Sequence, residues 1–193
     1  KLSIVLGPWR HSGVNYDGSS LGALKFSGDT ATEFRTQVMK PFLDAQLKTA
    51  APKADTPPVL IYETGMNRWS RMDRYPLACA KGCSTASKPL YLQAGGRLSF
   101  TAPTGPAGFE EYVADPNKPV PYLPRPVVFA DGDAWKRWLV TDQRFVDGRP
   151  DVLTFVSEPL TAPMRIAGAP VVNLFASTTG TDSDWVVKLI DVY

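Results

Sequence analysis

Short apolar runs separated by turn residues make up the chain from position 59 onward. The pattern predicts strands at 59–63, 90–93, 97–101, 127–130, 138–141, 152–157, 164–167, 171–177 and 185–193. In the last run both alternating sets of positions are apolar, which indicates a strand buried on both faces. Many short strands without a long helix are typical of a β-sandwich or jelly roll. The sequence therefore predicts a mainly β domain in this part of the chain.

The first fifty residues follow a different pattern. Residues 2–6 form an apolar run that ends at Gly7-Pro8, which predicts a short buried strand leading into a loop. Further on, Thr30 and Glu33 have the spacing of a capping box, which indicates the start of a helix. Apolar residues then recur near helical spacing on one face of that helix, at Phe34, Val38, Phe42 and, less strictly, Leu47. A kink is expected in this helix at Pro41, because proline has no N–H to donate to the preceding turn.

A polar, proline-rich segment at 51–58 lies between the two patterns. This composition is typical of linkers between domains. We therefore divide the chain into residues 1–50, a linker at 51–58 and a β domain at 59–193. We expect the β domain to be incomplete at its C-terminal end, because the last apolar run stops in the middle of an apparent strand.

Composition excludes several classes of function. The chain is 44% hydrophobic and 21% charged, which is ordinary for a globular protein. The net charge of +2 provides no extended basic surface for nucleic acid or for a membrane. No apolar run approaches the ~20 residues that cross a bilayer. With 1 histidine and 2 cysteines the chain lacks a full set of the usual zinc ligands, and we expect no metal and no cofactor.

His11 is the candidate catalytic residue, because it is the sole histidine and lies in the loop after the first predicted strand. Imidazoles are suited to proton transfer near neutral pH. A histidine base also needs a nucleophile and a carboxylate that orients it. A strand followed by a loop that carries a histidine is how α/β-hydrolases present the third member of their triad. An ordinary surface histidine is the alternative interpretation.

The segment Gly18-Ser19-Ser20-Leu21-Gly22 fits the pattern G-x-S-x-G of a nucleophile elbow. An elbow requires a hydrophobic strand before the serine and a helix after it, and in this fold the serine precedes the histidine. This segment follows His11 and has no apolar run before it. We therefore reject Ser20 as the nucleophile.

Several longer motifs resemble those of the cocaine esterase and X-prolyl dipeptidyl peptidase superfamily of serine hydrolases. The resemblance extends over essentially the whole chain. Within this superfamily, Gly13-Val14-Asn15-Tyr16 and the pair Cys79 and Cys83 resemble most the α-amino-acid ester hydrolases. The motifs that carry the resemblance are Gly7-Pro8-Trp9-Arg10-His11-Ser12-Gly13, Asp142-Gln143-Arg144, Arg149-Pro150-Asp151-Val152-Leu153, Ser157-Glu158-Pro159-Leu160 and Gly180-Thr181-Asp182-Ser183-Asp184-Trp185-Val186-Val187-Lys188-Leu189.

The resemblance implies that residues 1–50 are the last strand, histidine loop and helix of an α/β-hydrolase domain, followed by the jelly roll. His11 would be the triad histidine. The nucleophilic serine, the triad aspartate, the oxyanion donors and the acidic cluster that binds the substrate ammonium would all precede Lys1. Val128 and Phe129 would face the acyl pocket. The implied activity is hydrolysis of, and acyl transfer from, α-amino-acid esters and β-lactam antibiotics.

Further expectations concern the whole enzyme and its surroundings. The resemblance implies a homo-oligomer, taken here as a homotetramer, that acts on small molecules and binds neither nucleic acid nor membranes. A periplasmic or secreted location is expected. The 193-residue chain has a base but no nucleophile, so we expect it to be inactive by itself.

Two other functions remain open from the sequence. One is a cocaine-esterase-like hydrolase with a different ester preference, which would lack the acidic cluster for the ammonium group. The other is a non-catalytic jelly-roll binding module. A binding module accounts for residues 59–193, but it gives no purpose to the strand, loop and helix that contain His11.

The two cysteines lie in a turn-rich segment, and their chemistry is testable. Cys79 and Cys83 are separated by three residues, and no second cysteine pair is present to complete a zinc site. We predict a disulfide in protein isolated from an oxidising compartment, with two free thiols as the alternative. Alkylation under denaturing, non-reducing conditions, followed by mass measurement, should detect no labelled thiol. Two labelled thiols would remove this argument for an oxidising location.

Overall fold

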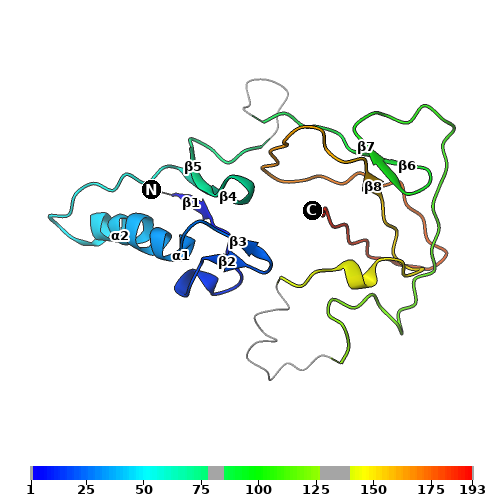
Figure 1. Ribbon diagram of the computed structural model, residues 1–193, viewed down its shortest axis with the longest axis horizontal. Helices are drawn as coiled ribbons and strands as arrows, with labels where there is room; N and C mark the ends of the chain where they lie inside the picture. Colours follow the sequence, from blue (N-terminus) through cyan, green and yellow to red (C-terminus); the bar gives the residue numbers. More distant parts are fainter. Residues whose placement is uncertain (1, 78–84, 127–139, 193) are drawn as a thin grey trace. The chain divides into compact units, whose positions relative to one another are not determined.

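The computed structural model describes residues 2–77, 85–126 and 140–192 (Figure 1). In these ranges the regular structure is mainly β, with short strands in three small sheets and a single long helical segment. The chain divides into two compact units, one of residues 1–75 and 88–164 and the other of residues 76–87 and 165–193. All the strands and helices of the described residues lie in the first unit.

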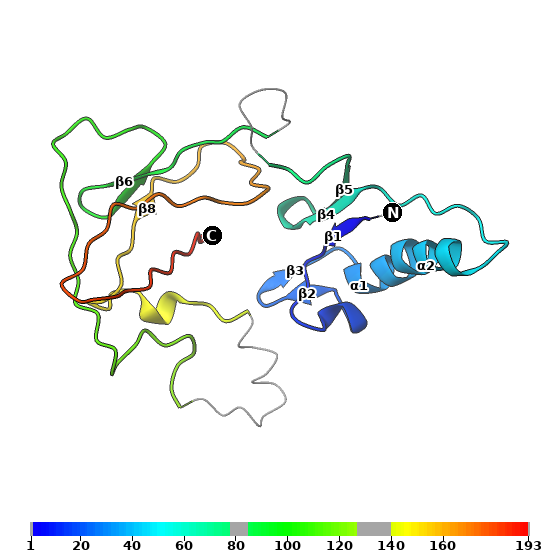
Figure 2. The same cartoon turned by 180° about the vertical axis from the view of Figure 1, so that it is seen from behind.

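The first sheet joins strands from both sides of the segment 51–58. Strand β1 (Ile4–Leu6) pairs in parallel with β4 (Val59–Glu63), which pairs antiparallel with β5 (Arg68–Met72), as both views show (Figures 1 and 2). The β4 side chains form most of the small core, with Val59, Leu60 and Tyr62 each less than a tenth exposed. The predicted strand at 59–63 is therefore confirmed, and it extends the sheet that begins with β1.

A turn between β4 and β5 fixes the position of Asn67. This residue follows the 3₁₀ turn η3 (Thr64–Met66) and has a left-handed backbone with φ of 50°. Asparagine adopts this conformation more readily than most residues. Its side-chain carbonyl accepts hydrogen bonds from the Tyr62 hydroxyl at 3.2 Å and from the Ser27 N–H at 3.1 Å. Asn67 thus links the sheet to the segment that precedes the helix.

The helix begins at Thr30 but is capped differently from the sequence prediction. It runs through α1 (Thr30–Glu33), a π-helical segment η2 (Phe34–Met39) and α2 (Lys40–Leu47). The cap is Asp29, whose carboxylate accepts from the N–H groups of Ala31 and Thr32 at 3.1 and 3.0 Å. The predicted capping box is therefore wrong, because buried Thr30 is inside the helix.

The predicted apolar face of this helix is only partly realised. Phe34, Val38 and Phe42 are half-buried, whereas Leu47 is exposed. Pro41 lies in the first turn of α2, immediately after the π-helical segment. Because Pro41 cannot donate to the carbonyl of Gln37, a regular α-helical ladder cannot run through this point.

Two small sheets complete the first unit. The hairpin of β2 (Ser20–Leu21) and β3 (Leu24–Lys25) turns at Gly22, whose φ is 58°. Strand β6 (Tyr91–Gln93) pairs antiparallel with β7 (Arg97–Ser99), which pairs in parallel with β8 (Val156–Ser157). The predicted strands at 90–93, 97–101 and 152–157 are present in shortened form.

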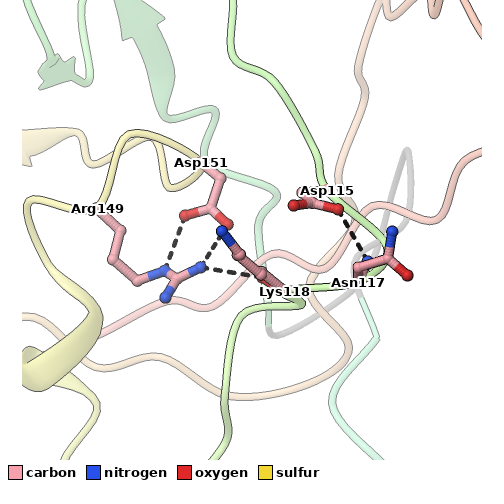
Figure 3. A network of polar contacts seen from close by, with 5 residues as sticks. All are labelled: Asp115, Asn117, Lys118, Arg149 and Asp151. Carbon is pink, nitrogen blue, oxygen red and sulfur yellow. Dashed lines mark hydrogen bonds and ion pairs between the residues drawn. The ribbon is translucent and has the colours of Figure 1, made fainter.

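An ion pair orders the irregular segment before β8. Arg149 binds the carboxylate of Asp151 through two nitrogens, at 2.8 and 2.6 Å, and also donates to the carbonyl of Lys118 at 3.3 Å (Figure 3). In the turn that leads to Lys118, the Asp115 carboxylate accepts from the Asn117 N–H at 2.9 Å. A bidentate arginine–carboxylate pair has a fixed geometry. It therefore holds the turn at 115–118 against the segment at 149–151.

Three predicted strands are absent from the structure. The predictions at 164–167 and 171–177 are wrong, as is the prediction at 185–193 for its described residues, since 164–192 contain no strand. Their apolar side chains are exposed, with Val171 and Val186 each 81% exposed. A strand needs a neighbour to receive its backbone hydrogen bonds, and apolar composition cannot supply one. The prediction at 127–130 and half of that at 138–141 lie outside the described residues.

Strand β1 is also less buried than its sequence predicts. Leu2, Ile4 and Leu6 occupy alternate positions and are 84%, 38% and 42% exposed. The predicted burial of this strand is therefore wrong for one face of the sheet, because alternate side chains of a strand share a face and these three are exposed. The division into domains at 51–58 stays a prediction, and so does the jelly-roll topology.

Replacing Asp29 tests the observed cap. We expect Asp29→Ala to lower the free energy of unfolding by about 1 kcal/mol, because two helix N–H groups lose their acceptor. The hydrogen bond from the Thr32 hydroxyl, followed by those from the N–H groups of Thr32, Gly18 and Ala31, lowers the Asp29 pKa from 3.8 to about 2. A lowered pKa stabilises the fold above pH 3.8, and this contribution is lost as the pH falls toward 2.

Urea unfolding of wild type and variant at several pH values measures this effect. The difference between them should be largest near neutral pH and should shrink between pH 3.8 and 2. Asp29→Asn is the matched control, because an asparagine can still cap a helix. A difference that does not depend on pH would contradict a role for the charged carboxylate.

Candidate functional site

His11 lies at the tip of the loop that connects β1 to the 3₁₀ turn η1 (Gly13–Asn15). The loop is tightly folded, since the Gly13 N–H donates to the Arg10 carbonyl at 2.8 Å. Ser12, which directly follows His11, has a left-handed backbone with φ of 61°. His11 itself is exposed. The loop therefore presents the imidazole on the surface of this part of the chain.

Trp9 anchors the loop two residues before His11. Its indole N–H donates to the Thr30 hydroxyl at 2.9 Å, and its ring lies 5.1 Å from that of Phe34. A Cβ at Gly7 would meet the same indole at 2.4 Å, so only glycine fits beneath it. One indole thus contacts the end of the strand, the start of the helix and the loop.

Further aromatic rings continue from Trp9 into the sheet. The Trp69 ring lies 5.9 Å from Trp9 and 5.1 Å from Tyr62, in an edge-on arrangement with the latter. The Trp69 indole donates to the Glu33 carboxylate at 3.1 Å. Burial, with a smaller contribution from the Glu33 charge, raises the pKa of Tyr62. Trp69 thus connects the sheet both to the helix, through Glu33, and to the loop, through Trp9.

The segment that follows the loop is bound to the helix start. The Thr30 hydroxyl donates to the Gly18 carbonyl at 2.8 Å, and the Gly18 N–H donates to the Asp29 carboxylate at 2.8 Å. A Cβ at Gly18 would lie 2.5 Å from the Ala31 nitrogen. A side chain is therefore excluded at Gly18 by the close approach of the two backbones.

Two arginines contact the backbone of the loop directly. Arg10 donates to the His11 carbonyl at 3.1 Å, and its guanidinium lies 5.9 Å from the centre of the Tyr16 ring. Arg35, from the helix, donates to the carbonyls of Val14 and Tyr16 at 2.6 and 3.0 Å. The backbone after His11 is thus held by a side chain twenty residues further along.

The G-x-S-x-G segment has no elbow geometry. Ser20 is exposed and belongs to the β2–β3 hairpin, so a strand turns back on a strand where an elbow would pass from strand to helix. Ser19, beside it, donates from its hydroxyl to Asp17 at 2.6 Å. This arrangement agrees with the rejection of Ser20 as nucleophile.

Other residues singled out from the sequence cannot be placed. Val128, Phe129, Cys79 and Cys83 lie outside the described residues. In the described ranges no three His, Cys, Asp or Glu residues are arranged to hold a metal ion. Nor does any helix there have the length and apolar character to cross a membrane.

Sequence reasoning missed the residues that support the loop. Trp9 enters the sequence analysis as a member of the motif around His11, with no role as an anchor, and the motifs identify neither Arg35 nor Asp29. An Asp directly before Thr30 was a readable signal for a cap. The partners of Arg35 are backbone carbonyls, which every residue has, so no sequence pattern could identify them.

Comparisons with known proteins agree with the motifs. Residues 52–193 match the family model of the X-Pro dipeptidyl-peptidase C-terminal non-catalytic domain. The chain belongs to this family. The family region begins within the segment 51–58, and His11 precedes it.

Longer relatives cover His11 as well. The cocaine esterase of Rhodococcus sp. (strain MB1 Bresler) is 32% identical over 98% of this chain, which spans 33% of that esterase. A solved structure of an α-amino acid ester hydrolase labelled with selenomethionine is 67% identical, with a TM-score of 0.78, over 86% of this chain and 27% of that one. An aminopeptidase from a marine sediment Thaumarchaeota archaeon is 47% identical, with a TM-score of 0.71, over 82% of this chain and 25% of that one.

The resemblance inferred from the motifs is therefore confirmed. As the motifs predict, the chain is similar to an α-amino acid ester hydrolase and to cocaine esterase. It spans about a third of the length of the cocaine esterase. The family model that matches residues 52–193 describes a non-catalytic domain, and residues 1–51, which contain His11, lie outside this match.

Replacing Trp9 tests the anchor under the loop. We expect Trp9→Phe to destabilise the protein by about 1–2 kcal/mol, because the hydrogen bond to Thr30 is lost and a smaller ring leaves a gap. Trp185→Phe is the matched control, since Trp185 is 44% exposed and should change stability by less than about 0.5 kcal/mol. Urea unfolding followed by circular dichroism compares the two. Equal losses would contradict the anchoring role.

Proposed function

We propose that this chain contributes the catalytic histidine, His11, to a serine hydrolase that acts on α-amino-acid esters. The observation that carries the proposal is an exposed imidazole on a loop fixed at both flanks, directly after a strand, in a chain 67% identical to an α-amino acid ester hydrolase. The motif Gly-Pro-Trp-Arg-His-Ser-Gly contains His11 and its anchor Trp9 in the same loop. This arrangement suits a general base that must keep its position through the reaction.

In the proposed mechanism His11 takes the proton of a serine hydroxyl as that oxygen attacks the ester carbonyl. His11 then returns the proton to the leaving alcohol, and an acyl-enzyme remains. Water, or an amine that accepts the acyl group, next attacks the acyl-enzyme with His11 again as base. The serine, the carboxylate that orients the imidazole and the oxyanion donors come from the rest of the protein, as the threefold greater length of the cocaine esterase suggests.

The proposed substrate class rests on what two relatives with different named activities have in common. One is an α-amino acid ester hydrolase and the other an aminopeptidase. Substrates of both classes have a free amino group beside the carbonyl that is attacked. We therefore propose two kinds of substrate with an α-ammonium group, α-amino-acid esters and β-lactam antibiotics with such a side chain. The enzyme would hydrolyse them or transfer their acyl group to an amine.

The remaining expectations belong to the same proposal. Residues 1–50 end the α/β-hydrolase domain, and the region from 59 onward forms a jelly roll that helps to close the active site, with Val128 and Phe129 at the acyl pocket. The enzyme is a homo-oligomer of the periplasm or of the medium. The family match at 52–193 supports the proposed domain boundary, because it begins within the segment 51–58.

A cocaine-esterase-like preference is the second candidate, because cocaine esterase is 32% identical over almost the whole chain. The two candidates differ in whether the substrate must have an ammonium group. Comparing phenylglycine methyl ester with phenylacetic acid methyl ester in the full-length protein separates them. A preference for the ester without the amine would favour the cocaine-esterase-like alternative.

Replacing His11 in the full-length protein tests the catalytic role. We expect His11→Ala to lower kcat for phenylglycine methyl ester by about 10⁴-fold or more and to change KM far less, because proton transfer is lost and binding groups lie elsewhere. The 193-residue chain alone should hydrolyse the ester no faster than buffer.

Arg144→Ala provides the control, because Arg144 is an exposed residue paired with Asp142 and should leave activity unchanged. A loss of kcat within about tenfold for His11→Ala would show that His11 is an ordinary loop residue.

A further inference from the structure

Two consecutive residues of the helix contact the His11 loop on opposite flanks. Phe34 lies against Trp9, with ring centres 5.1 Å apart, two residues before the histidine. Arg35 binds the carbonyls of Val14 and Tyr16, three and five residues after it. The backbone between these contacts is short, so its freedom is small, and His11 occupies its exposed tip.

Arg35 lies in the irregular part of the helix. It is the second residue of the π-helical segment η2, and its carbonyl accepts from the Lys40 N–H, five residues on. π-Helical turns are rare and occur frequently at functional sites. The widened turn therefore includes the two side chains that contact the loop.

The Arg35 guanidinium is also oriented from its other side. Its second terminal nitrogen donates to the Thr32 hydroxyl at 2.8 Å, and this hydroxyl donates to the Asp29 carboxylate at 2.5 Å. Asp29 is the helix cap and binds the Gly18 N–H. A continuous set of hydrogen bonds thus runs from the helix start through Arg35 to the backbone beside His11.

From these contacts we propose that Arg35 is a positioning residue for His11. Its guanidinium holds the Val14 and Tyr16 carbonyls and so fixes the loop in the conformation that presents the imidazole. The inference rests on the proposed role of His11 as general base. Arg35 contacts the loop backbone, so its effect on the reaction passes through the position of His11.

Two features of the loop make such a positioning residue necessary. Ser12 has φ of 61°, a conformation that costs a residue other than glycine free energy and persists only where its surroundings fix it. Proton transfer also needs donor and acceptor within about 2.6–3.2 Å, and a misplacement of about 1 Å can cost 10²-fold in rate. Restraint of the backbone on both sides of His11 meets both requirements.

The experiment uses the full-length protein with Arg35→Ala, Arg35→Lys and the matched control Arg71→Ala. Arg71 also donates to a backbone carbonyl and a carboxylate, both of Asp55. We expect Arg35→Ala to lower kcat roughly 10- to 100-fold with KM changed less than about threefold. Arg35→Lys should recover little, because an ammonium lacks the planar set of donors that a guanidinium offers. Arg71→Ala should keep wild-type kcat.

Two readouts separate positioning from a general loss of structure. Ethylguanidinium at concentrations far below denaturing ones should restore part of the kcat of Arg35→Ala and none of that of His11→Ala. The double variant His11→Ala/Arg35→Ala should be no slower than His11→Ala alone, because Arg35 acts through His11. A melting temperature near that of wild type should accompany the loss of kcat in Arg35→Ala.

The outcomes are distinguishable. If His11→Ala abolishes activity and Arg35→Ala keeps kcat within twofold, the positioning role is overturned and the proposed function stands. If the two losses multiply in the double variant, Arg35 does not act through His11 and the inference is likewise overturned. If His11→Ala retains activity, the proposed function fails and the positioning role fails with it. A kcat loss with guanidinium rescue and no further loss in the double variant supports the inference.

Discussion

The indole of Trp9 is the contact on which the ordered amino-terminal part of the molecule depends. It lies over Gly7, donates to Thr30 and contacts the rings of Phe34 and Trp69. Strand, helix and sheet therefore meet at one side chain. Aromatic rings provide a large buried area with few rotatable bonds, so such a contact fixes direction as well as distance. The conformation of the loop that follows is a consequence of this arrangement.

The parallel pairing of β1 with β4 connects the histidine loop to the family region. Strand β1 leads directly into the loop, and β4 is the first strand of the region that matches the non-catalytic family. The hydrogen bonds between β1 and β4 thus join strands on either side of the proline-rich segment that the sequence marks as a linker. The region that matches the non-catalytic family can in this way determine where the histidine loop begins, because the register of β4 sets the position of β1.

Charged side chains provide hydrogen-bond partners for the backbone around the loop, with a carboxylate accepting from N–H groups and a guanidinium donating to carbonyls. Asp29 caps the helix and binds the Gly18 N–H, whereas Arg35 reaches from the same helix to the loop carbonyls. Arg149 does the equivalent for a segment near β8, since it binds both Asp151 and the carbonyl of Lys118. In each case an irregular backbone obtains hydrogen-bond partners that no helix or sheet provides, which is how ordered loops satisfy their backbone groups.

Several features follow from the sequence alone. The Gly-Pro stop after an apolar run, the helix from Thr30 and the strand at 59–63 depend on local preferences and spacing, which the residues themselves specify. The motifs around His11 also identified the superfamily. The cap at Asp29 had a local signal in the Asp that directly precedes Thr30. The partners of Arg35 and the joining of β1 to β4 required the tertiary structure, because they involve backbone groups common to every residue. Apolar runs at 171–177 and 185–192 formed no strand, since a strand exists only with a neighbour that accepts its hydrogen bonds.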